Sequence, residues 1–366
     1  MIYLDSGATS FHKPRAVYKA VQNAMNMCAS PGRGGYLYAA NADKIVFECR
    51  ERLGKIFDCD AEKVVFTSNC THSLNIAIRS LIKPGAAVVV SGFEHNAVIR
   101  PLYALGAKIH VVGRRLFDHQ NILEEFEQAL KNGVDAAVFT HVSNVFGYIL
   151  PIDEMSELCK MYHTPFVIDV AQSAGYLPIS MTKLGADFIA APGHKGLLGP
   201  QGTGVLLCKD ECKPFIYGGT GSLSRNLTMP EYLPDRLEAG TLNVPGIAGL
   251  NAGVAYIQRN GVERIKNAVH ERMLYCVDGL KKIGLKPFEG EHQLGTISFV
   301  PDVDVEEFAQ LLSERGICVR SGLHCAPLAH ESAGTLESGT VRISVSHNNT
   351  FEQLNYFLKT VGNIVN

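Results

Sequence analysis

The sequence predicts an α/β protein built on a mainly parallel sheet of seven strands, with a smaller α+β domain attached. Two observations carry this prediction. Between about residues 60 and 210, short apolar and β-branched runs alternate with stretches of helical periodicity, a pattern typical of a parallel sheet covered by helices on both faces. After about residue 255, a long helical stretch is followed by a few short strands.

Seven strand-sized runs make up the first region: 64–67, 87–91, 109–112, 136–141, 166–170, 188–190 and 204–208. Stretches with helical periodicity lie between them, for example 74–81 and 155–162. We therefore expect a large domain over residues 15–255. Because such sheets bind ligands at the carboxyl ends of their strands, residues that follow each run are the first candidates for chemistry.

The second region predicts a small domain that residues 256–366 form together with residues 1–14. Its expected elements are a helix over 262–283, a strand at 296–300, a helix at 305–315, strands at 318–320 and 341–345, and a final helix.

Composition narrows the possible functions. The formal charge of −2 is spread over both signs, so we expect no nucleic-acid partner. The apolar runs are too short to span a bilayer, and residues 1–11 lack a cationic segment followed by an apolar run. We therefore expect a cytoplasmic protein without membrane association. The ten cysteines show no zinc-site spacing, so no metal site is expected.

Polar residues follow several of the predicted strands. The segment 67–73 carries hydroxyls and Thr71 at the start of a helix, which suits either a phosphate site or an ordinary helix cap. His95 could stack on a planar ring or be an ordinary core or surface histidine, and Asn144 could bind a ligand or hold a loop together.

Two further strand ends carry a carboxylate and an amine. Asp169 ends its strand, and a buried acid needs a partner, such as a protonated pyridine nitrogen or Mg²⁺. Lys195 lies in a turn of small residues, which suits Schiff-base chemistry. A phosphate-binding P-loop is excluded because Lys195 is followed by Gly196 rather than by Ser or Thr.

Five motifs, in order, resemble the class V aminotransferase-like family of pyridoxal-phosphate enzymes, and within it the cysteine desulfurase and selenocysteine lyase branch. The resemblance starts near the first residues and covers nearly the whole chain. The motifs are Tyr3-Leu4-Asp5-Ser6-Gly7-Ala8-Thr9, Asp169-Val170-Ala171-Gln172, Gly193-His194-Lys195, Glu238-Ala239-Gly240-Thr241 and Arg320-Ser321-Gly322-Leu323-His324-Cys325. The resemblance implies a fold of type I, like that of aspartate aminotransferase, and pyridoxal 5'-phosphate as the cofactor.

The resemblance also implies a role for each site residue. Lys195 would hold the cofactor as a Schiff base and move protons at the substrate's α-carbon, while Asp169 would pair with the ring nitrogen. Gln172 would bond the ring hydroxyl, and His95 would stack on the ring. The cofactor phosphate would be held by Thr71, by His194 and by Thr241 of a neighbouring subunit, which implies a homodimer with composite sites. Asn144 and Arg342 would hold the substrate carboxylate, with Arg320 nearby.

One position departs from the family pattern. The family usually has Ser immediately before the Gly-His-Lys motif, where its hydroxyl bonds the phosphate, but here the residue is Pro192. One phosphate contact is therefore missing or replaced.

Cys325 matches the family's sulfur-accepting nucleophile. The alternatives are a free surface cysteine or a metal cluster with Cys318, His324 and His330. The segment from Cys325 to Arg342 is short, and in this respect the chain resembles the subgroup of the family that includes selenocysteine lyase-like members.

The resemblance therefore implies a cysteine desulfurase, which converts L-cysteine to L-alanine and leaves the sulfur on Cys325 as a persulfide, for transfer to a possible acceptor protein. One alternative is a selenocysteine lyase, or another β-lyase or transaminase of this family. The non-enzymatic alternative is a degenerate scaffold that binds a sulfur-acceptor protein. Retention of Lys195, Asp169, His95 and Cys325 argues against the scaffold.

Overall fold

The computed structural model describes residues 1–32, 34–209 and 212–365. Its main sheet has seven strands in the order β2-β8-β7-β6-β5-β3-β4, in which β8 runs antiparallel to both neighbours and all other pairs are parallel. The predicted sheet is confirmed, and each predicted run begins and ends within two residues of the bounds of the corresponding strand. The strands are β2 (Val64–Thr67), β3 (Ala87–Ser91), β4 (Lys108–Val112), β5 (Ala136–Thr140), β6 (Phe166–Asp169), β7 (Phe188–Pro192) and β8 (Gly204–Cys208).

Helices cover both faces of this sheet. Val65, Val88 and Val90 point to the face covered by α3 (Cys70–Leu81) and α4 (Asn96–Ala104). Phe66 and Val89 point to the other face, because side chains alternate along a strand. Burial on both faces explains why the strands read as continuous apolar runs. The helices of the second face are α2 (Leu37–Phe57), α5 (His119–Lys131), α6 (Ile152–Met161) and α8 (Val244–Asn260), and α1 (Arg15–Met27) packs on α8.

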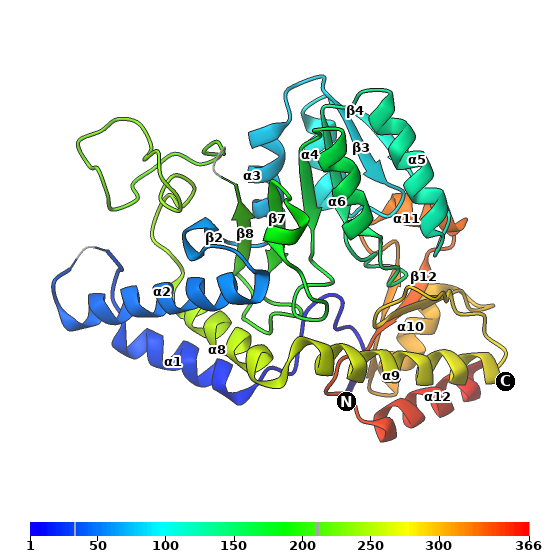
Figure 1. The fold of residues 1–366 in the computed structure, drawn as a ribbon. Helices are drawn as coiled ribbons and strands as arrows, with labels where there is room; N and C mark the ends of the chain where they lie inside the picture. Colours follow the sequence, from blue (N-terminus) through cyan, green and yellow to red (C-terminus); the bar gives the residue numbers. More distant parts are fainter. Residues whose placement is uncertain (33, 210–211, 366) are drawn as a thin grey trace.

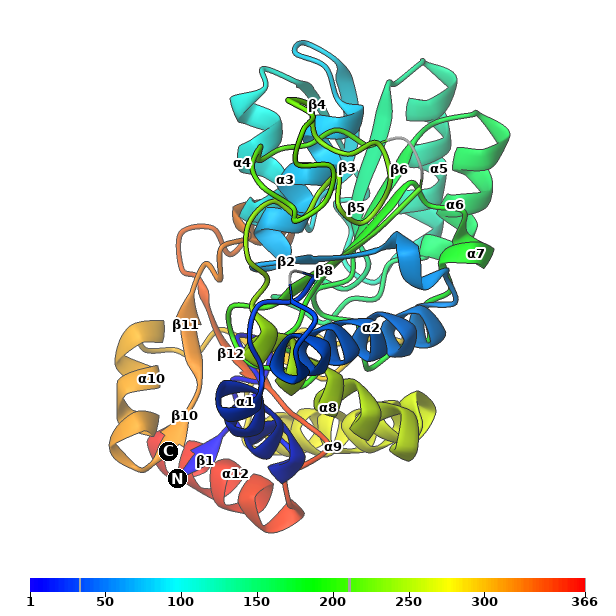
Figure 2. The same ribbon diagram turned by 90° about the vertical axis from the view of Figure 1, so that its left-hand side faces the viewer.

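A second apolar core lies around a three-stranded sheet of order β11-β12-β9. Its strands are β9 (Thr296–Phe299), β11 (Arg320–Gly322) and β12 (Thr340–Ser344), and its helices are α9 (Val262–Lys282), α10 (Val305–Glu314) and α12 (Phe351–Val365). These helices lie at the opposite end of the molecule from α3 to α6 (Figures 1 and 2). The division at residues 14/15 and 255/256 stays a prediction.

The strand predicted over 318–320 is wrong as a single element. It is two short strands, β10 (Ile317–Cys318) and β11, because the chain changes partner at Val319. β10 pairs with β1 (Ile2–Tyr3), whereas β11 pairs with β12. The first residues of the chain are thereby built into the C-terminal core.

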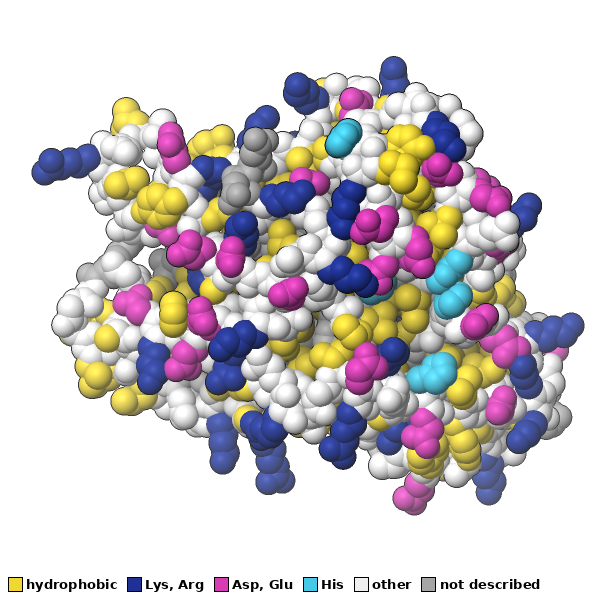
Figure 3. Space-filling model, viewed as in Figure 1, with side chains coloured by type: hydrophobic (Ala, Val, Ile, Leu, Met, Phe, Trp, Pro, Cys, Tyr) yellow, Lys and Arg dark blue, Asp and Glu magenta, His cyan; other side chains and the backbone are white. Residues whose placement is uncertain are grey.

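On the face shown in Figure 3, positive and negative side chains are interspersed over the described residues. No helix within the described part of the chain is long and apolar enough to cross a membrane.

A buried ion pair anchors the long segment between β8 and α8. The Glu238 carboxylate pairs with Arg50 of α2 and accepts a hydrogen bond of 2.6 Å from the backbone N–H of Phe66 in β2. The Arg50 guanidinium also lies 4.6 Å from the centre of the Phe66 ring. Burial raises the pKa of Glu238, while Arg50 opposes that shift. This contact ties residue 238, and with it the neighbouring Thr241, to the main sheet.

We expect Glu238→Ala to destabilise the protein by about 3 kcal/mol, because it leaves the buried Arg50 without its counter-charge. Glu231→Ala is a matched control in the same segment, since Glu231 is exposed and its loss should cost less than about 0.5 kcal/mol. Thermal unfolding of the two variants measures the difference. Equal melting temperatures would contradict this account of the pair.

Candidate active site

A cavity of about 190 Å³ opens at the carboxyl ends of β5, β6 and β7. It lies where ligands of a parallel sheet are expected. Seven of the eleven predicted site residues line it: Thr71, His95, Asn144, Asp169, Gln172, His194 and Lys195.

Asp169 is the last residue of β6 and is only 2% exposed. Its Oδ1 accepts hydrogen bonds from the Ala171 N–H at 2.8 Å and from the Cys70 thiol at 3.5 Å. Burial raises the pKa of Asp169, which the Ala171 bond and the nearby Lys195 oppose. The carboxyl group forms no salt bridge within the described chain, so a cationic ligand in the cavity would stabilise its charged form.

Lys195 stands in the turn that follows β7, and the close approach of two segments sets that turn. A Cβ at Gly193 would lie 2.1 Å from Thr203 Oγ1, so only glycine fits there. Burial lowers the pKa of Lys195, while Asp169 acts in the opposite direction. The lowered pKa increases the share of uncharged amine, which is the form that attacks a carbonyl.

His95 presents an uncharged ring to the cavity. Its Nδ1 accepts a hydrogen bond of 3.0 Å from the Ala97 N–H at the start of α4, which leaves the proton on Nε2. Burial, followed by Lys195, lowers the pKa of His95 to about 4. The ring is therefore neutral at physiological pH and suits stacking on a planar ligand.

The N-terminal segment of residues 5–10 crosses one side of the site. Gln172 Nε2 donates to the Gly7 carbonyl at 3.0 Å. The His194 carbonyl accepts from the Ser10 N–H at 3.0 Å and from Thr9 Oγ1 at 3.1 Å. Thr9 Oγ1 also lies 3.0 Å from His194 Nδ1, so this segment orients the His194 ring beside Lys195.

Thr241 does not share the cavity of Lys195. It is exposed and lines an adjoining cavity of about 640 Å³, which shares Asn69 and Thr71 with the first. Both shared residues lie at the N-terminus of α3, where Asn69 caps the helix by accepting from the His72 N–H at 2.9 Å. Backbone N–H groups at such a terminus favour an anion.

Two arginines form a cross-strand pair on neighbouring strands of the small sheet. Arg320 of β11 is the direct partner of Arg342 in β12. Arg342 is 2% exposed and donates to Asp5 Oδ1 at 2.6 Å and to the Asn144 carbonyl at 3.0 Å. Arg320 is exposed. Two like charges in this position repel each other, and Asp5 supplies only one negative charge against the two. The excess positive charge favours the binding of a second carboxylate.

Cys325 is exposed and lies on a loop whose backbone is held at two consecutive carbonyls. The His324 carbonyl accepts from Asn144 Nδ2 at 2.7 Å, and the Cys325 carbonyl accepts from the Asn96 N–H at 2.8 Å. His324 and Cys325 both have positive φ, of 50° and 58°, a conformation that costs a non-glycine residue about 1–2 kcal/mol. These contacts hold the backbone of the Cys325 loop against Asn144, which lines the cavity, and against Asn96.

The alternative of a metal cluster at Cys318, His324 and His330 is wrong. Within residues 1–32, 34–209 and 212–365, no three metal-binding side chains converge. His324 Nε2 lies 3.1 Å from Thr340 Oγ1, and His330 Nδ1 lies 2.8 Å from Thr335 Oγ1. Burial, followed by Arg342, lowers the pKa of His324 to about 2, so its ring stays neutral.

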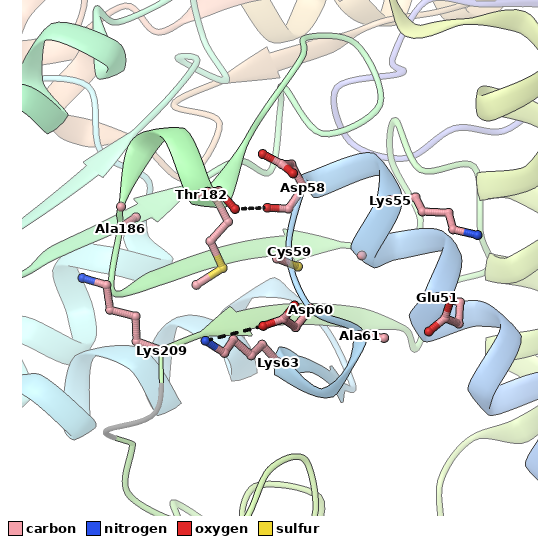
Figure 4. Close-up of a pocket in the computed structure, with 13 residues that line it drawn as sticks. Glu51, Lys55, Asp58, Cys59, Asp60, Ala61, Lys63, Thr182, Ala186 and Lys209 are labelled. Carbon is pink, nitrogen blue, oxygen red and sulfur yellow. Dashed lines mark hydrogen bonds and ion pairs between the residues drawn. The ribbon is translucent and has the colours of Figure 1, made fainter.

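A larger cavity of about 720 Å³ lies at the opposite edge of the sheet (Figure 4). It borders the amino ends of β2 and β7, and none of the predicted site residues lines it. Some of the polar groups there bond to one another: Thr182 Oγ1 donates to the Asp58 carbonyl at 2.7 Å, and Lys63 pairs with Asp60. Burial raises the pKa of Cys59 to about 11, so this thiol is a poor nucleophile.

The smaller cavity fits a planar cofactor with a ring nitrogen and a phosphate. Asp169 offers a buried carboxylate without a salt-bridge partner, and His95 offers a flat neutral ring. Lys195 offers an amine, and the start of α3 offers backbone donors. These groups line one cavity, as such a cofactor requires.

A lysine and a buried carboxylate that share a cavity at this edge of the sheet define an enzyme of fold type I, the aspartate-aminotransferase-like class. The sequence matches the family model described as aminotransferase class-V over residues 2–357. The chain belongs to the class V aminotransferase family.

Its relatives include proteins named as cysteine desulfurases. The chain is 31% identical to a probable cysteine desulfurase of Methanothermobacter thermautotrophicus, over 99% of this chain and 94% of the relative. It is 32% identical to a probable cysteine desulfurase of Pyrococcus abyssi, over 100% and 94%. The apo structure of the cysteine desulfurase from Thermococcus onnurineus superposes with a TM-score of 0.91 at 32% identity, covering 100% of this chain and 94% of that one.

Sequence reasoning missed Glu94, which joins the carboxyl ends of β3 and β5. Its Oε1 accepts from the Thr140 N–H at 2.9 Å and from the Ser91 hydroxyl at 2.5 Å, while the buried Oε2 has no partner among the described residues. Burial raises the pKa of Glu94 to about 8. Its position directly before His95 was the available signal, but an acid next to a histidine is common on protein surfaces.

We expect Glu94→Gln to reduce the loss of stability that the apo protein shows as the pH rises. The pKa of Glu94 is higher in the folded protein, at about 8, than in the unfolded chain, at about 4.3. Its contribution to stability is therefore complete below about pH 4.3 and is lost as the pH rises through about 8. Melting temperatures at pH 5 and pH 8 measure the effect, with exposed Glu352→Gln as control. The same fall in melting temperature for both variants would show that Glu94 is ionised in the fold.

Proposed function

We propose that this protein is a pyridoxal-phosphate-dependent cysteine desulfurase that acts in the cytoplasm. The observation that carries the proposal is the position of the Cys325 loop, which Asn144 and Asn96 hold beside the Lys195 cavity. A scaffold would need neither the strained backbone at Cys325 nor the buried charge at Asp169. The relatives named as cysteine desulfurases support the same function.

Lys195 and Asp169 supply the groups that the cofactor needs. Pyridoxal phosphate, when bound, withdraws electrons from the α-carbon of an amino acid. Asp169 would stabilise a protonated ring nitrogen, and His95 and Gln172 would orient the ring. The amine of Lys195 would hold the cofactor, and the same amine would accept and return the proton at Cα of the substrate.

The substrate is held by its carboxylate. We propose that Asn144 and Arg342 bind it and that Arg320 adds a second positive charge. Asp5 already occupies one side of the Arg342 guanidinium, so the substrate uses the remaining donors. Anchoring the carboxylate between the two arginines orients the side chain toward Cys325.

Cys325 carries out the sulfur transfer. Its thiolate attacks the sulfur of the substrate, so that a new S–S bond forms as the Cβ–S bond breaks. The electron pair of the broken bond passes to Cβ, which takes up a proton, and alanine leaves. The persulfide remains on Cys325, which is exposed and can pass its outer sulfur to an acceptor protein.

We expect Cys325→Ala to lower alanine release from L-cysteine to the level of Lys195→Ala, because no nucleophile is left to remove the sulfur. The same variant should still cleave selenocysteine, since the bond from selenium to carbon is weaker and selenium leaves without attack. Alanine assays with both amino acids measure this, with Cys318→Ala as a cysteine control on a neighbouring strand.

Two results would decide against the proposal. Wild-type alanine release from L-cysteine by Cys325→Ala would show that Cys325 is not the nucleophile. A wild-type protein that binds no pyridoxal phosphate, seen as no visible absorption after incubation and dialysis, would favour the scaffold.

We also propose a homodimer in which Thr241 of each subunit reaches the phosphate site of the other. Thr241 is exposed and lies outside the Lys195 cavity, beside the start of α3. A second subunit that supplies this hydroxyl would make up for the hydroxyl that Pro192 cannot offer.

We expect a molecule of twice the 39.8 kDa chain mass in analytical ultracentrifugation. We also expect Thr241→Val to weaken pyridoxal-phosphate binding about tenfold, the cost of a missing hydrogen bond to a charged group. Thr228→Val, an exposed threonine of the same segment, should leave binding unchanged. A fully active monomer would rule out the composite site.

A further inference from the structure

A buried thiol lies directly against the carboxylate of the active site. Cys70 is the first residue of α3, is 9% exposed and lines the same cavity as Lys195. Its Sγ lies 3.5 Å from Asp169 Oδ1, within the range of a thiol hydrogen bond. The proposed sulfur transfer uses Cys325 and gives Cys70 no task.

The two oxygens of Asp169 have different surroundings. Oδ1 accepts both the Ala171 N–H and the Cys70 thiol. Oδ2 accepts no hydrogen bond from the described residues, although it is not sealed from the cavity. Oδ2 is therefore the oxygen left for a ligand, while Cys70 and Ala171 satisfy the other one.

The direction of the thiol bond follows from the burial of Cys70. Burial, followed by the neighbouring Asp169, raises the pKa of Cys70 well above its ordinary value. The group stays protonated, so S–H donates and Oδ1 accepts. The position of the donor is well defined, because Asn69 caps α3 and Ser73 Oγ bonds the Val205 carbonyl at 3.1 Å.

We propose that Cys70 is a positioning residue, whose thiol holds Asp169 ionised and turns Oδ2 toward the ring nitrogen of the cofactor. A donor to Oδ1 stabilises the charged form of a buried carboxylate. The ionised carboxylate in turn stabilises a protonated ring nitrogen, which makes the bound ring a better electron acceptor. This inference rests on the proposed function, since it needs pyridoxal phosphate in this cavity.

The test compares two cofactors that differ only at the ring nitrogen. One is pyridoxal phosphate and the other is its analogue with C–H in place of that nitrogen. Their affinities for the apo protein are measured by absorbance titration for wild type, Cys70→Ala and Cys70→Ser. Cys276→Ala is the control, because Cys276 is a fully buried cysteine in the other apolar core.

We expect Cys70→Ala to weaken pyridoxal-phosphate binding about five- to tenfold, since a hydrogen bond to a charged group is removed. Cys70→Ser should restore most of the affinity, because its hydroxyl can donate in the same direction. The analogue should bind wild type and Cys70→Ala equally, since its ring offers Asp169 nothing to pair with.

Each other outcome has a distinct meaning. Equal weakening of both cofactors in Cys70→Ala would reduce Cys70 to a packing residue and overturn the inference. Unchanged binding of pyridoxal phosphate in that variant would overturn it as well. If wild type binds neither compound, the proposed function itself fails. A misfolded Cys70→Ala is recognised by circular dichroism, and Cys70→Ser then decides: it should keep wild-type discrimination between the two cofactors.

Discussion

The buried carboxyl group of Asp169, at the end of a central strand, is the constraint around which the site is built. An ionised carboxylate buried among apolar strands costs several kcal/mol unless other groups stabilise it. The Ala171 N–H and the Cys70 thiol stabilise one oxygen, and Lys195 supplies a positive field. The same carboxylate favours the charged form of Lys195, so the two groups are electrostatically coupled.

The N-terminal segment links the two apolar cores at this site. It bonds Gln172 and His194, which follow β6 and β7 of the main sheet, and Arg342 of the small sheet, while β1 pairs with β10. Asn144 provides a second link through the His324 carbonyl. The Cys325 loop and the Lys195 cavity are thus held by hydrogen bonds from both cores.

Much of this architecture could be predicted from the sequence because periodicity reports burial directly. The strands at 64–67 and 204–208 match the predicted runs to the residue. Asp169 and Lys195, singled out because they end or follow predicted strands, line one cavity. The partner change at Val319 could not be predicted, since it depends on β1, more than 300 residues away. Nor could the roles of Cys70 and Glu94, because a thiol or acid gains such a role only from what the fold places within bonding distance.

The contact between Asp5 and Arg342 also bears on how the protein is made. These residues are separated by 337 positions, so a ribosome adding about 5–20 residues each second needs roughly 20 to 70 s between them. During that interval the emerging segment has neither β10 nor Arg342 to bind. Residues 64–208, in contrast, contain every strand of the main sheet and can pair as they emerge. The contacts of the N-terminal segment to Gln172 and His194 can form earlier, but its contacts to β10 and Arg342 are among the last of the site to form.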